Sequence, residues 1–402
     1  MSEEKRDFIT ITLKSGHRKS IMRHHPWIFS GAIAGFIGKP TSGETVLVRD
    51  SFGEFVAWGS YSPKSKIRVR VYSWHEGEMI NRNFFERRLL KAIDYRKQVI
   101  DLKKVNSYRM INAESDGLPG LVVDKYDNVI VMQVLSAGIE KWREVIADLL
   151  MKITGVTNIF ERSDVEVRKL EGLPIRKGNL RGNVPEDLIK IEENDLMFLV
   201  DIREGHKTGF YLDQRENRRT VQDISFGKHV LDCFSYTGGF TLAALKGGAA
   251  SITAVDSSTS AISLAKQNLQ INGFDSNKVN FIVDDVFTSL RKFRDRGMKF
   301  DLIILDPPKF APTINLVERA SRGYKDINLL AFKLLNQGGK LITFSCSGAI
   351  DPELFQKIVA GAALDAGVNG RISKRLFQGV DHPVSLSFPD GLYLKGFVIN
   401  ID

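Results

Sequence analysis

The segment from His229 to Asp256, HVLDCFSYTGGFTLAALKGGAASITAVD, restricts the fold of this chain more than any other stretch. Residues 229–232 are short, mostly apolar and end in an acid, which is typical of a buried parallel strand. A small-residue turn follows, and then a helical pattern at 240–246 that ends in two glycines. Residues 251–255 form a second apolar run that also ends in an acid. This order predicts the first half of a nucleotide-binding α/β unit.

The turn between the first strand and the helix indicates which nucleotide such a unit would bind. It consists of Phe234, Ser235, Tyr236, Thr237 and Gly238. A dinucleotide site would need G-x-G-x-x-G, and here neither residue 234 nor residue 235 is glycine. An S-adenosylmethionine (SAM) site needs only a close turn at a helix N-terminus and an acid for the ribose hydroxyls, here Asp256. The turn by itself leaves another cofactor, or none, as an alternative.

Unusual residues also stand at the end of three later strands. The apolar run 280–283 ends at Asp284-Asp285, and the run 300–305 continues into Asp306-Pro307-Pro308-Lys309. The run 339–345 ends at Cys346. Open α/β sheets bind their ligands at the carboxyl ends of the strands. We therefore expect these residues to gather at one ligand-binding edge.

These motifs resemble the class I SAM-dependent methyltransferases. CFSYTGGF, DPPKF, FSCSG and the upstream GHKTGFYLDQRENR resemble, more narrowly, the bacterial 23S ribosomal RNA (cytosine-C5)-methyltransferases that contain a PUA domain. The resemblance extends over essentially the whole chain. It implies an α/β fold with a Rossmann-like seven-stranded class I methyltransferase sheet, whose last strand is antiparallel. It also implies three domains: a PUA RNA-binding β-barrel at 1–75, a small α+β domain at 76–190 and a catalytic domain at 191–402.

The expected cofactor site combines the strand ends with one upstream segment. Its expected members are residues Phe234, Ser235, Tyr236, Thr237, Gly238, Asp256, Ser257, Asp284, Asp285, Val286 and Asp306, with Tyr211 and Gln214 from the upstream segment. Asp213 and Glu216 have the spacing of a capping box, which predicts a helix that begins at Gln214. In similar methyltransferases this segment closes over the methionine end of SAM. A well-capped helix with no ligand contact is the simpler interpretation.

Carbon 5 of cytosine is a poor nucleophile, and an enzyme can activate it by adding a thiolate to carbon 6. The chain has two cysteines. Cys233 lies where small buried cysteines commonly fill space, whereas Cys346 follows the fifth strand, at the expected ligand-binding edge. We expect Cys346 to be the nucleophile, with an inert buried thiol as the alternative.

The Asp306-Pro307-Pro308-Lys309 motif is expected to contact the substrate. Many N-methyltransferases have an aromatic residue at the position of Lys309, and its absence favours reaction at carbon 5. A base must then remove the proton from carbon 5. Asp306, Asp381 and His382 are candidates, and the sequence does not choose among them.

Clustered positive charge predicts nucleic-acid binding by the N-terminal region. The whole chain has a net charge of +9, and its first 75 residues contain twelve Lys or Arg and six Asp or Glu. The run KIRVRVY predicts a strand with Lys66, Arg68 and Arg70 on its outer face. That face is either a ladder of phosphate contacts or a solvated edge that prevents aggregation.

The middle region contains an amphipathic helix at about 84–104 and short strands. Glu114 and Asp116 lie in a turn, and we interpret them as turn-forming residues, with a wall of the substrate cleft as the alternative.

Composition narrows the classes of protein to which the chain could belong. The chain has no apolar run long enough to span a membrane, no secretory signal pattern and too few cysteines for a disulfide framework. We expect a cytoplasmic enzyme without a metal, whose partner is 23S ribosomal RNA, and the sequence also allows a homodimer. Two other functions stay open: an RNA base N-methyltransferase, and a non-catalytic RNA-binding factor in ribosome assembly.

Overall fold

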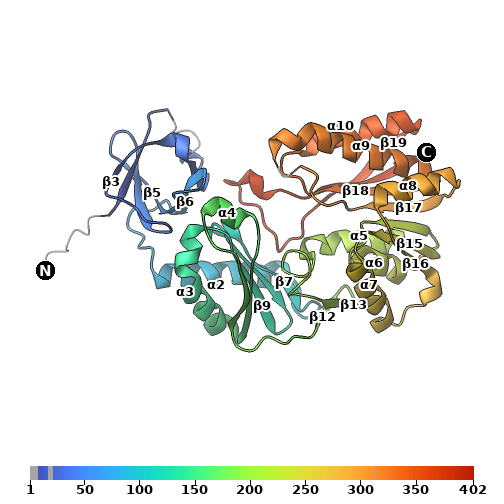
Figure 1. Ribbon diagram of the computed structural model, residues 1–402, viewed down its shortest axis with the longest axis horizontal. Coiled ribbons are helices and arrows are strands. Elements are labelled where there is room, and N and C mark those ends of the chain that lie inside the picture. The colour runs from blue at the N-terminus through green and yellow to red at the C-terminus, as the bar shows by residue number, and fades with distance from the viewer. Residues whose placement is uncertain (1–7, 17–20, 312) are drawn as a thin grey trace. The chain divides into compact units, whose positions relative to one another are not determined.

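The computed structural model describes residues 8–16, 21–311 and 313–402, which form two compact units (Figure 1). The first unit contains the described residues of 1–191 together with Val200–Leu212 and Val380–Gly391. The second contains Glu192–Leu199, Asp213–Gly379 and Leu392–Asp402. The division into 1–75, 76–190 and 191–402 stays a prediction, although segments 200–212 and 380–391 pack with the first unit rather than the second. Four of the N-terminal cations, Lys5, Arg6, Arg18 and Lys19, lie outside the described residues.

The N-terminal part of the first unit is a sheet of short strands in the order β2-β6-β5-β4-β1-β3. Their bounds are β1 Thr10–Leu13, β2 Trp27–Phe29, β3 Ile33–Ile37, β4 Thr45–Arg49, β5 Phe55–Tyr61 and β6 Ile67–Ser73. Strands β4 and β5 pair antiparallel and form a hairpin. Its turn is fixed because Asp50 Oδ1 accepts the backbone N–H groups of Phe52 at 2.9 Å and Glu54 at 3.0 Å. Apolar side chains such as Val46, Val48 and Val69 fill the core of this sheet.

Strand β6 corrects one prediction, because the three cations do not share an exposed face. Lys66 is exposed and Arg68 is half-buried, donating to the carbonyls of Ser62 and Pro63. Arg70 is only 6% exposed, and its Nη1 donates to Glu171 at 2.7 Å. The simple alternation fails because both faces of β6 are covered from Val69 onward.

The rest of the first unit is a five-stranded sheet in the order β11-β10-β9-β8-β7 with two long helices. The bounds are α2 Arg82–Val99, β7 Ser107–Asn112, β8 Leu121–Tyr126, β9 Val129–Val134, α3 Ala137–Thr154, β10 Asn158–Ser163, α4 Val167–Glu171 and β11 Arg176–Arg181. Asn81 caps α2 and Ser136 caps α3 through side-chain oxygens. The short helix η2, Ala113–Asp116, contains Glu114 and Asp116, so both lie in the expected turn after β7. Strands β12 Ile189–Glu193 and β13 Leu196–Val200 form a two-stranded hairpin. Its residues Glu192–Leu199 belong to the second unit.

The second unit is built on a seven-stranded sheet in the order β16-β15-β14-β17-β18-β20-β19. The bounds are β14 His229–Cys233, β15 Ser251–Asp256, β16 Val279–Val283, β17 Phe300–Leu305, β18 Leu335–Ser345, β19 Gly370–Phe377 and β20 Lys395–Ile401. Strands β14 to β18 are mutually parallel, whereas β20 runs antiparallel to both β18 and β19. The predicted seven-stranded sheet with an antiparallel last strand is therefore confirmed.

Helices cover both faces of this sheet, as Figure 1 shows. The helices α5 Arg215–Ile224, α6 Gly239–Lys246 and α7 Thr259–Ile271 lie on one face, and α8 Val286–Asp295, α9 Val317–Leu334 and α10 Pro352–Ala366 lie on the other. Aromatic side chains including Tyr324, Phe355 and Phe397 pack between the second set of helices and the sheet. Among the described residues, none of the helices is both long enough and apolar enough to cross a membrane.

Candidate active site

The turn after β14 is folded tightly. Phe234, Tyr236 and Gly238 have φ angles of 62°, 46° and 82°, and this left-handed region is strained for the two aromatic residues. The Ser235 N–H donates to the Val255 carbonyl at 3.1 Å, and the Gly238 N–H donates to the Ser235 carbonyl at 2.8 Å. The turn therefore reaches the N-terminus of α6 as a preformed loop, where backbone N–H groups favour a polar ligand.

The carboxylate of Asp256 is held in one orientation at the end of β15. Its Oδ2 accepts the Tyr236 N–H at 2.8 Å, and its Oδ1 accepts the Ser258 N–H at 2.8 Å. Each carboxylate oxygen keeps a further acceptor position. The half-buried Asp256 can thus accept both hydroxyls of a ribose, in the place expected from the sequence.

The same turn and the end of β14 contain buried hydrogen-bonding atoms that have no protein partner among the described residues. Ser235 Oγ, Thr237 Oγ1 and Asp232 Oδ1 are buried and have no hydrogen-bond partner among the described residues. Buried polar atoms in native proteins are almost always bonded. Unused donors and acceptors beside Asp256 therefore fit a polar cofactor such as SAM.

Three carboxylates meet at neighbouring strand ends, and this raises the pKa of the most buried one. Burial, together with the negative charges of Asp306 and Asp256, raises the pKa of Asp232 to about 7, although Thr241 Oγ1 donates to it at 2.6 Å. Strongly perturbed carboxyl groups are typical of ligand-binding edges.

Asp284 and Asp285 follow β16, and their side chains already have protein partners. Asp284 Oδ2 accepts from Lys292 Nζ at 2.7 Å and from Ser289 Oγ at 3.0 Å. Asp285 Oδ1 accepts the Thr288 N–H at 2.8 Å and caps α8. Val286 is the buried first residue of α8, whereas Ser257 is exposed after β15. The predicted contact of these four residues with the cofactor stays a prediction.

The upstream segment divides between the two units. Tyr211 belongs to the first unit, where its hydroxyl lies 3.2 Å from His206 Nδ1 and the Lys207 ammonium lies 4.6 Å from its ring centroid. Gln214 belongs to the second unit, and its Nε2 donates to Asp306 Oδ1 at 3.1 Å. Gln214 therefore joins the cofactor edge through Asp306.

The predicted capping box at this segment is wrong. Helix α5 begins at Arg215, after the short helix η3, Leu212–Gln214, and no side chain caps it. Asp213 is 5% exposed and its Oδ2 accepts the Tyr393 hydroxyl at 2.6 Å. Local spacing assigned the Asp213 carboxylate to the helix cap, but in the folded protein it is bonded to Tyr393 instead.

Cys346 lies directly after β18, at the ligand-binding edge, and is half-buried. Its Sγ lies 3.9 Å from the carbonyl oxygen of Pro307 on the loop after β17. The flanking residues are fixed, since Ser345 Oγ and Ser347 Oγ both lie 3.0 Å from the Tyr324 hydroxyl. The sulfur is thus accessible on a rigid support.

Sequence reasoning missed Lys395, the first residue of β20. Lys395 pairs with Ser345 across the strands, is 2% exposed, and donates through Nζ to the carbonyls of Ser347 at 2.7 Å and Ile350 at 2.6 Å. Burial lowers the pKa of Lys395 to about 8, while Cys346 raises it and Lys309 lowers it. An ammonium group that is still charged at neutral pH therefore stands beside the cysteine. The one available signal was a lysine opening an otherwise apolar strand.

The Asp306-Pro307-Pro308-Lys309 motif forms the other wall of this edge. Asp306 is half-buried, Pro307 is buried, and Pro308 and Lys309 are exposed. The other two candidate bases are placed differently. Asp381 and His382 are buried in the first unit, where Asp381 Oδ2 accepts the Arg109 N–H at 3.0 Å and Oδ1 lies 2.9 Å from His382 Nδ1.

The descriptions of proteins with similar sequences agree with this site. A family model described as S-adenosylmethionine-dependent methyltransferase matches residues 178–383, and a PUA-like domain model matches residues 11–74. The ribosomal RNA large subunit methyltransferase I of Klebsiella pneumoniae subsp. pneumoniae is 48% identical over 394 residues, which are 98% of each chain. The chain belongs to the ribosomal RNA large subunit methyltransferase I family. A protein of the same name from Escherichia coli is 47% identical over 393 residues, covering 98% of this chain and 99% of its own.

A solved structure has the same fold. SMU.776, a methyltransferase crystallised with SAH, superimposes with a TM-score of 0.86 at 22% identity and covers 97% of this chain and 99% of its own. The predicted PUA-like first domain, the class I methyltransferase sheet and the use of SAM are confirmed for this member of the large subunit methyltransferase I family.

Proposed function

We propose that this enzyme methylates carbon 5 of a cytosine in 23S ribosomal RNA and that Cys346 forms a covalent bond to carbon 6 of that base. The observation that supports this most is the placement of Cys346: half-exposed at the edge of the sheet, 3.9 Å from the Pro307 carbonyl and beside the buried ammonium of Lys395. The names of the relatives support ribosomal RNA as the substrate.

The reaction begins with the thiolate. A neighbouring cation stabilises a thiolate, which is the nucleophilic form of cysteine. The Cys346 thiolate adds to carbon 6, and the electron pair of the C5–C6 double bond makes carbon 5 nucleophilic. Bound SAM supplies the electrophilic methyl group that carbon 5 takes up. Asp256 and the turn 234–238 would hold the cofactor's nucleoside, with Ser257, Asp284, Asp285 and Val286 toward the adenine and Gln214 toward the methionine end.

The last step requires a base. Removal of the carbon 5 proton re-forms the C5–C6 double bond and expels the thiolate from carbon 6. We assign this proton transfer to Asp306, because it lies at the end of β17, the strand adjacent to β18, and is half-buried. Asp381 and His382 are bonded within the first unit, which argues against either as the base.

We assign the RNA contacts mainly from the exposure of the side chains. The exposed Pro308 and Lys309 contact the target base and its phosphate, with the buried Pro307 supporting them, while Lys66, just before β6, and Arg68 of β6 contact the backbone elsewhere. Arg70 makes no phosphate contact in this proposal, because its guanidinium is ion-paired inside the protein.

An RNA substrate that contains 5-fluorocytidine tests the mechanism. Fluorine at carbon 5 cannot leave as a proton, so elimination stalls and the enzyme stays bound to the RNA. The wild-type adduct should survive denaturing electrophoresis, and Cys346→Ala should form none and lose nearly all turnover while it still binds SAM. Cys233→Ala, the matched control, should form the adduct. Near wild-type methylation by Cys346→Ala, or attachment through Cys233, would contradict the mechanism and favour methylation of an exocyclic amine.

A further inference from the structure

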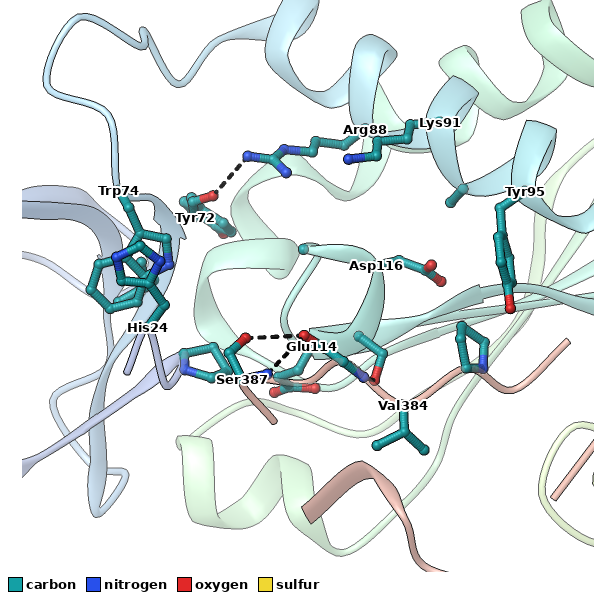
Figure 2. A pocket seen from close by; sticks show the side chains of 17 residues that line it. His24, Tyr72, Trp74, Arg88, Lys91, Tyr95, Glu114, Asp116, Val384 and Ser387 are labelled. Carbon is teal, nitrogen blue, oxygen red and sulfur yellow. Dashed lines mark hydrogen bonds between the residues drawn. The ribbon is translucent and has the colours of Figure 1, made fainter. Parts of the chain in front are cut away.

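A cavity of about 450 Å³ lies in the first unit, and its lining contains none of the residues assigned to the cofactor or to Cys346 chemistry (Figure 2). Its walls come from the end of β6, from α2, from η2 and from the segment 383–387. The volume is in the range of pockets that hold small organic groups. Nothing in the proposed chemistry uses this cavity.

Aromatic side chains stand on opposite sides of the cavity, as Figure 2 shows. On one side, the ring of His24 stacks on Trp74 with a centroid distance of 4.5 Å and an interplanar angle of 9°. On the other side, Tyr95 of α2 is 37% exposed. His24 is exposed although its backbone has a φ of 57°, a conformation that most side chains avoid. Exposed aromatic faces of this kind are the surfaces on which unpaired bases stack.

Two cations from one face of α2 border the same space. Arg88 and Lys91 are three residues apart, so they lie on neighbouring turns of the helix (Figure 2). Arg88 Nη2 makes only long contacts, 3.4 Å to the Tyr72 carbonyl and 3.5 Å to Glu78. Lys91 is exposed and has neither a hydrogen bond nor an ion pair with any residue that the structure describes. Its ammonium is therefore available to an anion.

The carboxylates of the cavity, Asp116 and Glu114, have partners of their own in its wall. Asp116 accepts from the fully buried Arg96 at 2.7 Å. Glu114 accepts from Trp27 Nε1 at 2.9 Å, and its carboxylate lies 3.8 Å from Arg70 Nε. Arg70 thus has a place that the sequence did not suggest: it lies between Glu114 and Glu171 instead of facing solvent.

We infer that the cavity binds one nucleotide of single-stranded RNA outside the catalytic centre, with the base against His24 or Tyr95 and the phosphate at Arg88 and Lys91. Serine hydroxyls on the remaining wall, at Ser115, Ser385 and Ser387, supply donors and acceptors for the sugar or the base edge. The matched PUA-like region ends at Trp74, so the cavity continues from an expected RNA-binding surface. The inference rests on the proposed function only in taking RNA as the ligand.

Binding of a fluorescently labelled single-stranded oligoribonucleotide, followed by anisotropy at several salt concentrations, tests the site. Tyr95→Ala removes a stacking surface and should weaken binding at least about fivefold. Lys91→Gln should reduce the slope of log affinity against log salt by about 0.7, the value for one phosphate contact on a single strand. Both residues are exposed, so thermal melting should be unchanged.

Matched controls separate the cavity from general charge and aromatic effects. Lys97→Gln removes an exposed ammonium from the same helix that is paired with Asp94 and does not line the cavity, and it should leave the slope nearly unchanged. Phe226→Ala removes an aromatic ring that is 84% exposed in the second unit, and it should leave affinity unchanged. If Tyr95→Ala and Lys91→Gln bind the RNA like these controls, the inference is wrong.

A second measurement, of tryptophan fluorescence, does not depend on a change in RNA affinity. RNA binding should quench tryptophan fluorescence in the wild type, and Trp74→Phe should lose most of that quenching because the base joins the His24–Trp74 stack. Equal quenching in both proteins would overturn the stacking assignment. Neither measurement requires SAM or methyl transfer, so a failed 5-fluorocytidine experiment would leave these results standing, and the reverse also holds.

Discussion

Strands β14 and β18 belong to the same sheet and both lead to a cysteine, yet the two thiols have opposite surroundings. Cys233 is fully buried, and burial, with the negative charge of Asp232, raises the pKa of its thiol well above the usual value. Cys346 is half-exposed and stands beside the buried ammonium of Lys395. Burial and the neighbouring acid keep the Cys233 thiol protonated, whereas a nearby ammonium is the kind of neighbour that stabilises a thiolate. Two cysteines at the carboxyl ends of strands in one sheet thus differ in burial and in the charges that neighbouring strands supply.

The largest expected effect that tests this comparison is on the pH dependence of stability, through Asp232 beside Cys233. Because the pKa of Asp232 is raised to about 7 from an ordinary value near 4, the folded protein binds more protons than the unfolded chain between about pH 4 and pH 7. The contribution of Asp232 to the free energy of unfolding therefore falls as pH rises through this window, by about 4 kcal/mol at about 1.4 kcal/mol per unit. Asp232→Asn should remove this fall, measured by denaturant unfolding in the absence of SAM.

Asp301→Asn is the control for that measurement. Burial raises the pKa of Asp301, but hydrogen bonds from the His229 N–H and Asn336 outweigh it, so the pKa is lowered overall. Its contribution is present above the unfolded pKa and is lost as pH falls, which is the opposite sign. If Asp232→Asn follows the wild-type pH dependence, the acidic strand end does not have the electrostatics described above.

A smaller effect separates cofactor binding from thiol chemistry. Asp256→Ala removes the acceptor of both ribose hydroxyls and should weaken SAM binding at least about tenfold in calorimetry, which corresponds to a net loss of at least about 1.4 kcal/mol. The alkylation rate of Cys346 in the same variant should stay at the wild-type value, because the thiol lies on another strand. Unchanged SAM affinity in a folded variant would exclude Asp256 as the ribose acceptor.

The smallest expected effect is on the alkylation rate of Cys346, which Lys395 should influence. Lys395→Met removes the ammonium beside Cys346, and we expect iodoacetamide to alkylate Cys346 about tenfold more slowly at neutral pH, which corresponds to about 1.4 kcal/mol of lost thiolate stabilisation. Lys395→Arg should retain most of the rate, since it keeps the charge. Lys340→Met, on β18 but bonded to Asn400, should alkylate like the wild type. Equal rates in Lys395→Met and Lys340→Met would remove Lys395 from the mechanism.

Local pattern predicted the sheet well and the polar contacts less well. The run 300–305 and the glycine turn at 234–238 have the conformations expected, because apolar periodicity and small residues act through near neighbours. The capping box at Asp213 and the exposed face at Arg70 were wrong. In both cases a partner distant in sequence, Tyr393 for Asp213 and Glu171 for Arg70, binds the polar group that local spacing placed elsewhere.

The sequence by itself determined the order of strands and helices and the tight turn beside Asp256, because strand ends and small-residue turns are encoded within a few residues. Only the tertiary structure decided which charges meet. Lys395 reaches Ser347 from 48 residues away, Arg70 reaches Glu171 from 101 residues away, and Asp232 acquires its raised pKa from acids on two other strands. Electrostatic effects depend on distance in space and on burial, and neither quantity exists until the chain has folded.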